Sequence, residues 1–256
     1  MIPVRRTLLA VPPMLIATTA AWAESCPANH DQLQQALRAS VKPSGGPTNG
    51  GFDNNEWAAI TDRNGVLCAI AFSGAKPADQ WLGSRAIAAE KANTANALSL
   101  DNYAMSTANL YSGAQPNGFL FGLQMTNPPN GPALLAGDPS TFGSGSDPLL
   151  GKPVGGVVVF GGGLALYSQG HVVGGLGASG DTSCADHNIA WRIRAALKLD
   201  QVPAGPTPQK DGIIYDIQPD KTSASGFGHP SCVGKEPEIA EQLKAGSTPG
   251  WAKPRQ

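Results

Sequence analysis

The positions of apolar and polar residues divide this 256-residue chain into short helices and strands separated by loops. Apolar residues recur every three or four positions at 30–41 and 184–199, and an alanine-rich run covers 81–98, so each of these segments is predicted to be a helix. Apolar runs bounded by glycine, proline and asparagine are typical of strands. Five runs fit that description, at 57–60, 66–72, 154–160, 164–167 and 172–178.

The order of these segments predicts the fold class. A turn at 62–65 that ends in Asn-Gly joins the first two strands as a hairpin, and glycine-rich turns join the last three into a meander. Hairpins without strand–helix–strand alternation favour an antiparallel sheet with helices packed on it. We therefore predict an α+β domain with about five antiparallel strands. The tail at 200–256 is rich in proline and glycine, with a strand-like run at 213–217 and a short helix at 236–244.

The first 23 residues have the features of a signal peptide. Arg5 and Arg6 precede an uncharged, mostly apolar stretch, which ends in the small-x-small pattern of Ala21 to Ala23. The stretch is shorter than the roughly 20 apolar residues that a bilayer requires, so a membrane anchor is the weaker alternative. We expect a mature chain that begins at Glu24 and is periplasmic or secreted. Either the general secretory route or the twin-arginine route is open.

The charge of the expected mature chain excludes one class of partner. Of 18 basic residues, Arg5 and Arg6 lie in the leader, which leaves 16 against 19 acidic residues. A nearly neutral chain without a basic stripe is not expected to bind nucleic acid, because phosphate binding requires clustered lysine and arginine. No later segment is apolar and long enough to span a membrane.

The cysteine count predicts covalent cross-links. An even number of cysteines in an exported chain favours two disulfides, and four cysteines allow three pairings. Metal binding is the alternative, but the chain has no CxxC pair and no CxxCH haem-attachment motif. The four candidates are Cys26, Cys68, Cys184 and Cys232.

Glycine is concentrated between positions 155 and 180. A dinucleotide-binding loop would need one strand before its glycines and one helix after them, whereas these glycines punctuate strands. The run at 175–180 leads into a predicted helix, where free N–H groups can hold a carboxylate or phosphate. Plain turn geometry explains the same glycines, so both interpretations stay open.

Several segments resemble one known family. Residues 89–95 are similar to its Lys-Ala-x-Thr-Ala helix, and 161–166 followed by 170–180 are similar to its glycine-rich hairpin. The turn at 61–67 also fits, and Asp186, at the start of the predicted helix at 184–199, matches an aspartate that opens the family's last helix. Together they resemble the HbpS/GlcG family, also called haem-degrading or DUF336-like, over roughly residues 56–199.

This resemblance implies a fold and a ligand. The family fold is a profilin-like α/β/α sandwich that often forms homo-oligomers and binds haem or another tetrapyrrole. We assign 24–199 to such a domain and 200–256 to a C-terminal extension. The sequence departs from the family in an enlarged loop region at 100–147, in Ala165 at a position usually occupied by proline, and in its cysteines and tail.

The candidate ligand site combines the helix motif with the glycine-rich turn. Lys91 and Thr94 lie one turn apart on a helix, so both can face one pocket. A solvated lysine and a buried threonine are the alternative. Three consecutive glycines would leave the backbone open to a flat or bulky ligand. These are Gly161, Gly162 and Gly163.

The start of the predicted helix at 184–199 would close this site. Asp186 and His187 lie in its first turn, and histidine can ligate haem iron. An aspartate is also favoured there simply by the helix dipole. We predict that His187 is the metal ligand and that Lys91 pairs with a ligand carboxylate.

Three functions are compatible with these observations. The leading hypothesis is an exported small-molecule-binding protein whose ligand is haem or a related tetrapyrrole. The second is an enzyme of haem degradation, or of another small-molecule conversion, that uses Lys91 and Asp186. The third is an accessory partner of an exported oxidoreductase. No nucleophile motif supports a hydrolase, since Asp181 occupies the last position that a Gly-x-Ser-x-Gly motif around Ser179 would require.

Overall fold

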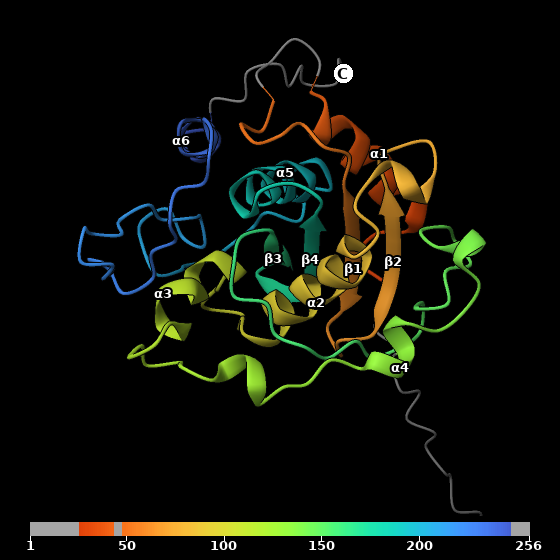
Figure 1. Cartoon of the computed structure of the whole chain (residues 1–256), viewed down its shortest axis with the longest axis horizontal. Helices are drawn as coiled ribbons and strands as arrows, with labels where there is room; N and C mark the ends of the chain where they lie inside the picture. Colours follow the sequence, from red (N-terminus) through yellow and green to blue (C-terminus); the bar gives the residue numbers. More distant parts are fainter. Residues whose placement is uncertain (1–25, 44–47, 247–256) are drawn as a thin grey trace, which may run out of the picture.

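A computed structural model describes residues 26–43 and 48–246. The predicted signal peptide lies outside the described residues. Figure 1 shows the elements in chain order. The helices are α1 (His30–Val41), α2 (Ser84–Ala97), α3 (Tyr111–Ala114), α4 (Gly131–Leu134), α5 (Ser183–Ala196) and α6 (Glu236–Lys244). The strands are β1 (Trp57–Asp62), β2 (Leu67–Phe72), β3 (Gly163–Ser168) and β4 (His171–Ser179).

The four strands form one antiparallel sheet in the order β2-β1-β4-β3. Strands β1 and β2 form one hairpin, and β3 and β4 form the other. The two hairpins are joined because β1 also pairs with β4, with Trp57 opposite Ser179 and Ile60 opposite Leu176. The C-terminal ends of β2 and β4 lie beside the start of β1. Residues that precede β1 therefore lie close to those that follow β4.

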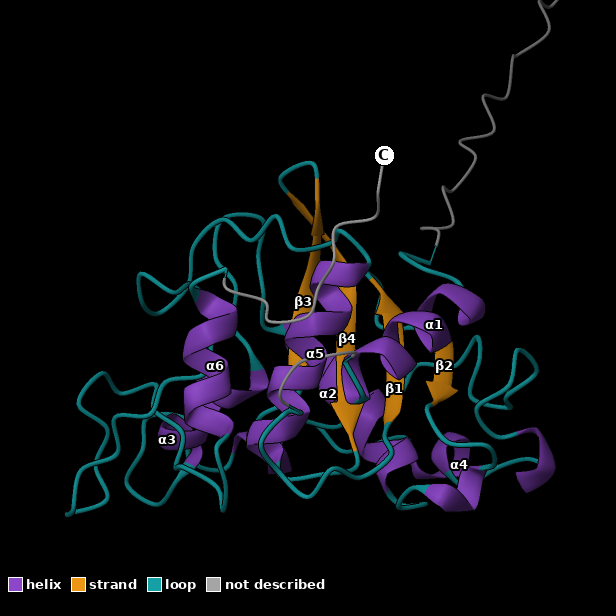
Figure 2. Cartoon of the chain, turned by 90° about the horizontal axis from the view of Figure 1, so that it is seen from above, coloured by secondary structure: helices purple, strands orange, loops and turns teal. Residues whose placement is uncertain are grey.

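Helices cover both faces of this sheet. Helices α1 and α5 pack on one face, and α2 crosses the other, which gives an α/β/α sandwich (Figures 1 and 2). Ala58 and Ile60 of β1 belong to the core under α1 and α5, whereas Trp57 and Ala59 belong to the core under α2. Because both faces are buried, the strand reads as a continuous apolar run.

Glycines in β4 explain how closely α2 approaches the sheet. A Cβ atom on Gly175 would lie 2.1 Å from the carbonyl oxygen of Ala92, and one on Gly177 would lie 1.9 Å from that of Ala88. Any side chain at either position would push the helix away. The glycine-rich hairpin therefore sets the distance between α2 and the sheet.

One of the five predicted strands is absent, and the sheet has four strands. The segment at 154–160 makes a single bridge, between Gly155 and Pro129, because Gly155 and Gly156 adopt φ values of +65° and +74° that interrupt an extended chain. The run at 213–217 makes one isolated bridge, from Ile217 to Ser223. The predicted helix at 81–98 begins only at Ser84.

The region at 100–147 contains only short helical pieces. Besides α3 and α4 it holds single turns of 3₁₀-helix at Thr107–Leu110, Leu123–Met125 and Pro139–Thr141, and a further turn, Pro77–Asp79, precedes α2. The domain boundaries at 199 and 200 stay a prediction. No helix in the described part of the chain is long and apolar enough to cross a bilayer.

Candidate functional site

A buried ion pair joins the two helices that lie on opposite faces of the sheet. Nζ of Lys91, in α2, lies 2.6 Å from Oδ2 of Asp186, in α5, and also donates a hydrogen bond of 3.0 Å to the carbonyl oxygen of Ala178 in β4. The Lys91 side chain is fully buried and that of Asp186 is 3% exposed. The small residues of β4 let the lysine reach across the end of the sheet.

The other carboxylate oxygen of Asp186 is held by the backbone before α5. Oδ1 accepts hydrogen bonds from the N–H groups of Gly180, at 3.2 Å, and Asp181, at 2.9 Å. Burial raises the pKa of Asp186 above its ordinary value, and the charge of Lys91 partly opposes this effect. The carboxylate is thus fixed at both oxygens, which is the geometry of a positioned group and not of a mobile side chain.

A third ionisable group, Glu56, lies in the same cluster and was missed by the sequence analysis. Its side chain is completely buried directly before β1 and lies close to the carboxylate of Asp186. Burial, and then the charge of Asp186, raise the pKa of Glu56 well above its usual value. Glu56 is therefore a neutral acid across an extended pH range, beside a carboxylate and an ammonium group. We call Glu56, Lys91 and Asp186 the charged cluster.

Thr94 lies one turn further along α2 and has a structural contact. Its hydroxyl donates to the carbonyl oxygen of Glu90 at 2.7 Å and accepts the N–H of Val158 at 3.0 Å. The threonine therefore anchors the 154–160 segment, which was predicted to be a strand, against α2.

The three glycines lie close to other predicted site residues, and they are packed against protein. A Cβ on Gly161 would lie 2.1 Å from the carbonyl oxygen of Ser183 and 3.1 Å from Cβ of His187. One on Gly162, whose φ is +114°, would lie 2.8 Å from Nζ of Lys91. The backbone here is approached by α5 and α2 themselves, which leaves no gap for a flat ligand against these glycines.

His187 is covered by the C-terminal extension. Its ring is buried, and Nε2 accepts the backbone N–H of Ile213 at 3.1 Å, so the ring proton resides on Nδ1. Nδ1 has no partner among the described residues. Burial, followed by the charge of Arg194, lowers the pKa of His187 well below its ordinary value. His187 is a neutral imidazole beneath the extension.

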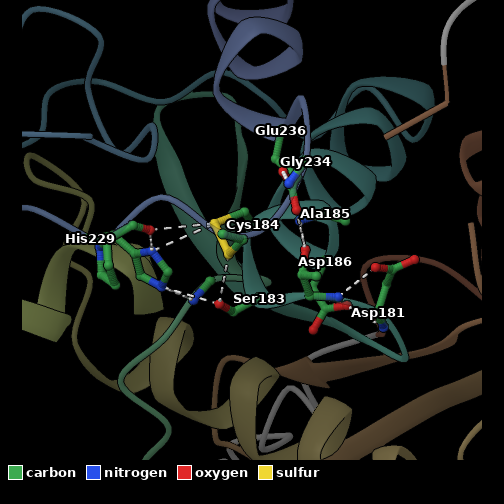
Figure 3. The surroundings of a disulfide bond; sticks show 12 residues. Asp181, Ser183, Cys184, Ala185, Asp186, His229, Gly234 and Glu236 are labelled. Carbon is green, nitrogen blue, oxygen red and sulfur yellow. Dashed lines mark hydrogen bonds between the residues drawn. A yellow bond between two sulfur atoms is a disulfide. The ribbon is translucent and has the colours of Figure 1, made fainter. Parts of the chain in front are cut away.

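Two disulfides are present, as predicted, and one of them ties the extension to α5. The pairs are Cys26–Cys68 and Cys184–Cys232, and no free cysteine occurs among the described residues. Figure 3 shows His229 beside the second pair, with its ring directed at Ser183 and Cys184. Nε2 of His229 accepts the N–H of Gly161 at 3.4 Å, and burial lowers its pKa to about 4.

These contacts separate the predicted residues by role. Lys91, Asp186 and Gly162 meet in one cluster, while Gly161 and His187 meet under the extension on the α5 side. The neutral imidazole of His187 has the donor chemistry that haem iron requires. However, the backbone of Ile213 occupies its Nε2, and α6 packs over it. A haem does not fit beside His187 in this conformation.

The family model for the haem-degrading, HbpS-like proteins matches residues 53–195. No curated protein matches. Solved structures similar to this chain at low sequence identity include the following three. Klebsiella pneumoniae protein ORFY, assigned to DUF336, is 20% identical with a TM-score of 0.44, over 66% of this chain and 86% of that one.

The other two structures are a PduOC–haem complex and a double mutant of HbpS from Streptomyces reticuli. The first is 28% identical, with a TM-score of 0.43, and covers 65% of this chain and 89% of that chain. The second is 15% identical, with a TM-score of 0.38, and covers 76% and 99%. The family model alone spans more than half of the sequence and includes the charged cluster, the three glycines and His187. The chain therefore belongs to the HbpS-like family of haem-degrading proteins.

Proposed function

We propose that this chain is an exported protein that binds haem or a related tetrapyrrole. The observation that carries the proposal is the family match over 53–195, which contains every predicted ligand-site residue. His187 is the candidate iron ligand because a neutral imidazole has a lone pair, which lies on Nε2 and accepts the N–H of Ile213 in this conformation. The ring becomes available when the Ile213 segment moves away from Nε2. Lys91 is held by Asp186 and Ala178, so we assign it a positioning role in place of direct pairing with a propionate.

A haem titration of the mature protein tests this proposal. Wild type should develop the absorption band of ligated haem. His187→Ala should weaken binding at least tenfold, about 1.4 kcal/mol. His171→Ala is the matched control, because His171 is an exposed histidine at the start of β4, with a side chain that is 72% exposed. Absence of a haem band in wild type contradicts binding, and equal affinity in the two variants contradicts the role of His187.

Export is supported by two observations. The leader has a cleavage pattern that ends at Ala23, and two disulfides in the described residues suit an oxidising compartment. N-terminal sequencing of the protein recovered from outside the cytoplasm should begin at Glu24. Recovery of the intact chain from the cytoplasm alone, with reduced cysteines, would contradict export.

The charged cluster favours a second function, haem degradation. Two buried carboxyl groups with raised pKa values lie beside a lysine, an arrangement that can hold and transfer a proton, and such clusters are typical of functional sites. Haem-loaded protein given a reductant and oxygen should then lose its haem band and release iron. Glu56→Gln should keep haem binding and slow that loss at least tenfold. A haem-loaded wild type that is stable under these conditions is a binder only.

A further inference from the structure

A cavity of about 640 Å³ lies at the start of α2, away from the charged cluster and from His187. It is open to solvent on one side and is lined by the 3₁₀ turn before α2, by the first turn of α2, and by α4 and the loop that follows it. Its volume is within the range of small-molecule sites, about 300–1,000 Å³. Most of its walls are apolar: Ala78, Leu82, Ala86, Leu134, Leu135 and Phe142.

The floor of the cavity is held in place by a buried arginine. Arg85 is 3% exposed, donates from Nε to Oδ2 of Asp147 at 2.9 Å and from Nη1 to the carbonyl oxygen of Leu134 at 3.1 Å, and pairs a second time with Asp147. Its guanidinium lies 3.8 Å from the centre of the Phe142 ring. These contacts join α2 to the 134–147 loop, so the cavity is formed before any ligand arrives. They also neutralise the charge of Arg85.

The cavity carries one unneutralised charge and an incomplete apolar wall. No acidic side chain lines it, and Lys76, at its rim, forms no ion pair within the described residues. Leu135 is 85% exposed and Leu82 is 62% exposed, which is a large apolar area to leave in water around a concave surface. A ligand that covers the leucines and presents one negative group to Lys76 would satisfy both features.

We propose that this cavity binds a small molecule with an apolar body and a carboxylate, with the body against Leu82, Ala86 and Leu135 and the carboxylate beside Lys76. The site shares no lining residue with the charged cluster or with His187, and it does not depend on the proposed function. A fatty acid and a porphyrin propionate both have this chemistry, so the test includes both.

Isothermal titration calorimetry with decanoic acid, decanol and protoporphyrin IX tests the site. Decanoate should bind wild type with one molecule per chain, and roughly fivefold more tightly than decanol, as expected for one exposed charge pair. Lys76→Gln should abolish that difference. Lys42→Gln, which changes an exposed lysine at the end of α1, should preserve it. Binding of porphyrin in competition with decanoate would identify a tetrapyrrole as the occupant; binding of decanoate alone would identify an aliphatic acid.

Two variants locate the binding. Ala86→Phe fills the cavity and should abolish binding of all three probes, and Leu135→Ser removes an exposed wall residue without touching the core and should weaken it at least fivefold. His187→Ala should leave decanoate binding unchanged, because His187 does not line the cavity. A loss of haem binding in this variant would therefore not concern the cavity. The proposal is overturned if wild type binds no probe, or if folded Leu135→Ser and Ala86→Phe proteins bind as wild type. It is also overturned if sedimentation shows a dimer that Leu135→Asp dissociates, since a second copy would then cover the leucines.

Discussion

Lys91 and Asp186 are 95 positions apart in the chain, and their side chains form a buried ion pair of 2.6 Å. The pair links α2 to α5 through the end of the sheet, and the neutral acid Glu56 lies against it. A buried ion pair contributes little net stability, because the attraction only offsets the loss of hydration. The pair is therefore weak evidence for stability by itself.

Removal of either Lys91 or Asp186 should reveal the cost of burying the other charge. Lys91→Met leaves Asp186 buried without its counter-charge, which should lower the free energy of unfolding by about 3 kcal/mol. The decrease in the free energy of unfolding should be smaller in the double variant Lys91→Met/Asp186→Asn, because neither charge of the pair remains. Urea unfolding measures both. Glu241→Gln, which breaks the exposed pair with Lys244, is the control and should change stability by less than about 1 kcal/mol. Equal effects of Lys91→Met and Glu241→Gln would contradict the burial argument.

Glu56 should make stability fall as the pH rises. Its pKa in the folded protein is raised above the ordinary value of 4.5, so the folded state retains a proton that the unfolded state has lost. The stabilisation is complete below that ordinary value and decreases as the pH rises towards the folded pKa. Urea unfolding between about pH 5 and about pH 9 should show this decrease in wild type and a smaller one in Glu56→Gln. Identical slopes in the two proteins would show that Glu56 is not the responsible group.

The periodic segments could be predicted from sequence because their signal is local. The helix at 30–41 has the observed bounds, and the hairpin around Asn64-Gly65 follows from its turn. The prediction of a strand at 154–160 was wrong. Its apolar composition is that of a strand, but the positive φ values of Gly155 and Gly156 keep the segment out of the sheet. Composition alone does not show which glycines adopt such angles.

The candidate site was predicted only in part, because some of its residues belong to local motifs whereas others are brought together only by the tertiary fold. The resemblance placed Lys91, Gly162 and Asp186 together, and the structure brings them together. Glu56 carried no motif, and two of the charged groups that raise its pKa, Asp181 and Asp186, are more than a hundred positions away in the chain. A single acidic residue directly before the apolar run at 57–60 is the one local signal that could have identified it. The covering of His187 by the extension had no sequence signal.

The disulfide that ties the extension to α5 should contribute to stability. Removal of Cys184–Cys232 by a double serine substitution should lower the free energy of unfolding by about 2–5 kcal/mol, because the cross-link restricts the unfolded chain. The unmodified protein should show no reactive thiol when denatured without reductant. Detection of two or more thiols per chain would contradict the pairing. The matched variant without Cys26–Cys68 shows whether the effect is specific to the extension, since only the first variant should increase hydrogen exchange around Ile213.

Gly162 tests whether the glycine-rich turn is a packing device. A methyl group there would lie 2.5 Å from the carbonyl oxygen of Ala178 and 2.8 Å from Nζ of Lys91, and the φ of +114° disfavours any side chain. Strain and overpacking together should make Gly162→Ala less stable by about 2–5 kcal/mol. Gly145→Ala is the control, because a Cβ at Gly145 would meet nothing within 4 Å and its φ is not positive. Thermal unfolding of both proteins decides between the two roles. A large loss confined to Gly162→Ala identifies a close contact between α2, α5 and β4. If Gly162→Ala is as stable as Gly145→Ala, the turn has room to spare, and direct ligand contact with these glycines becomes the better explanation.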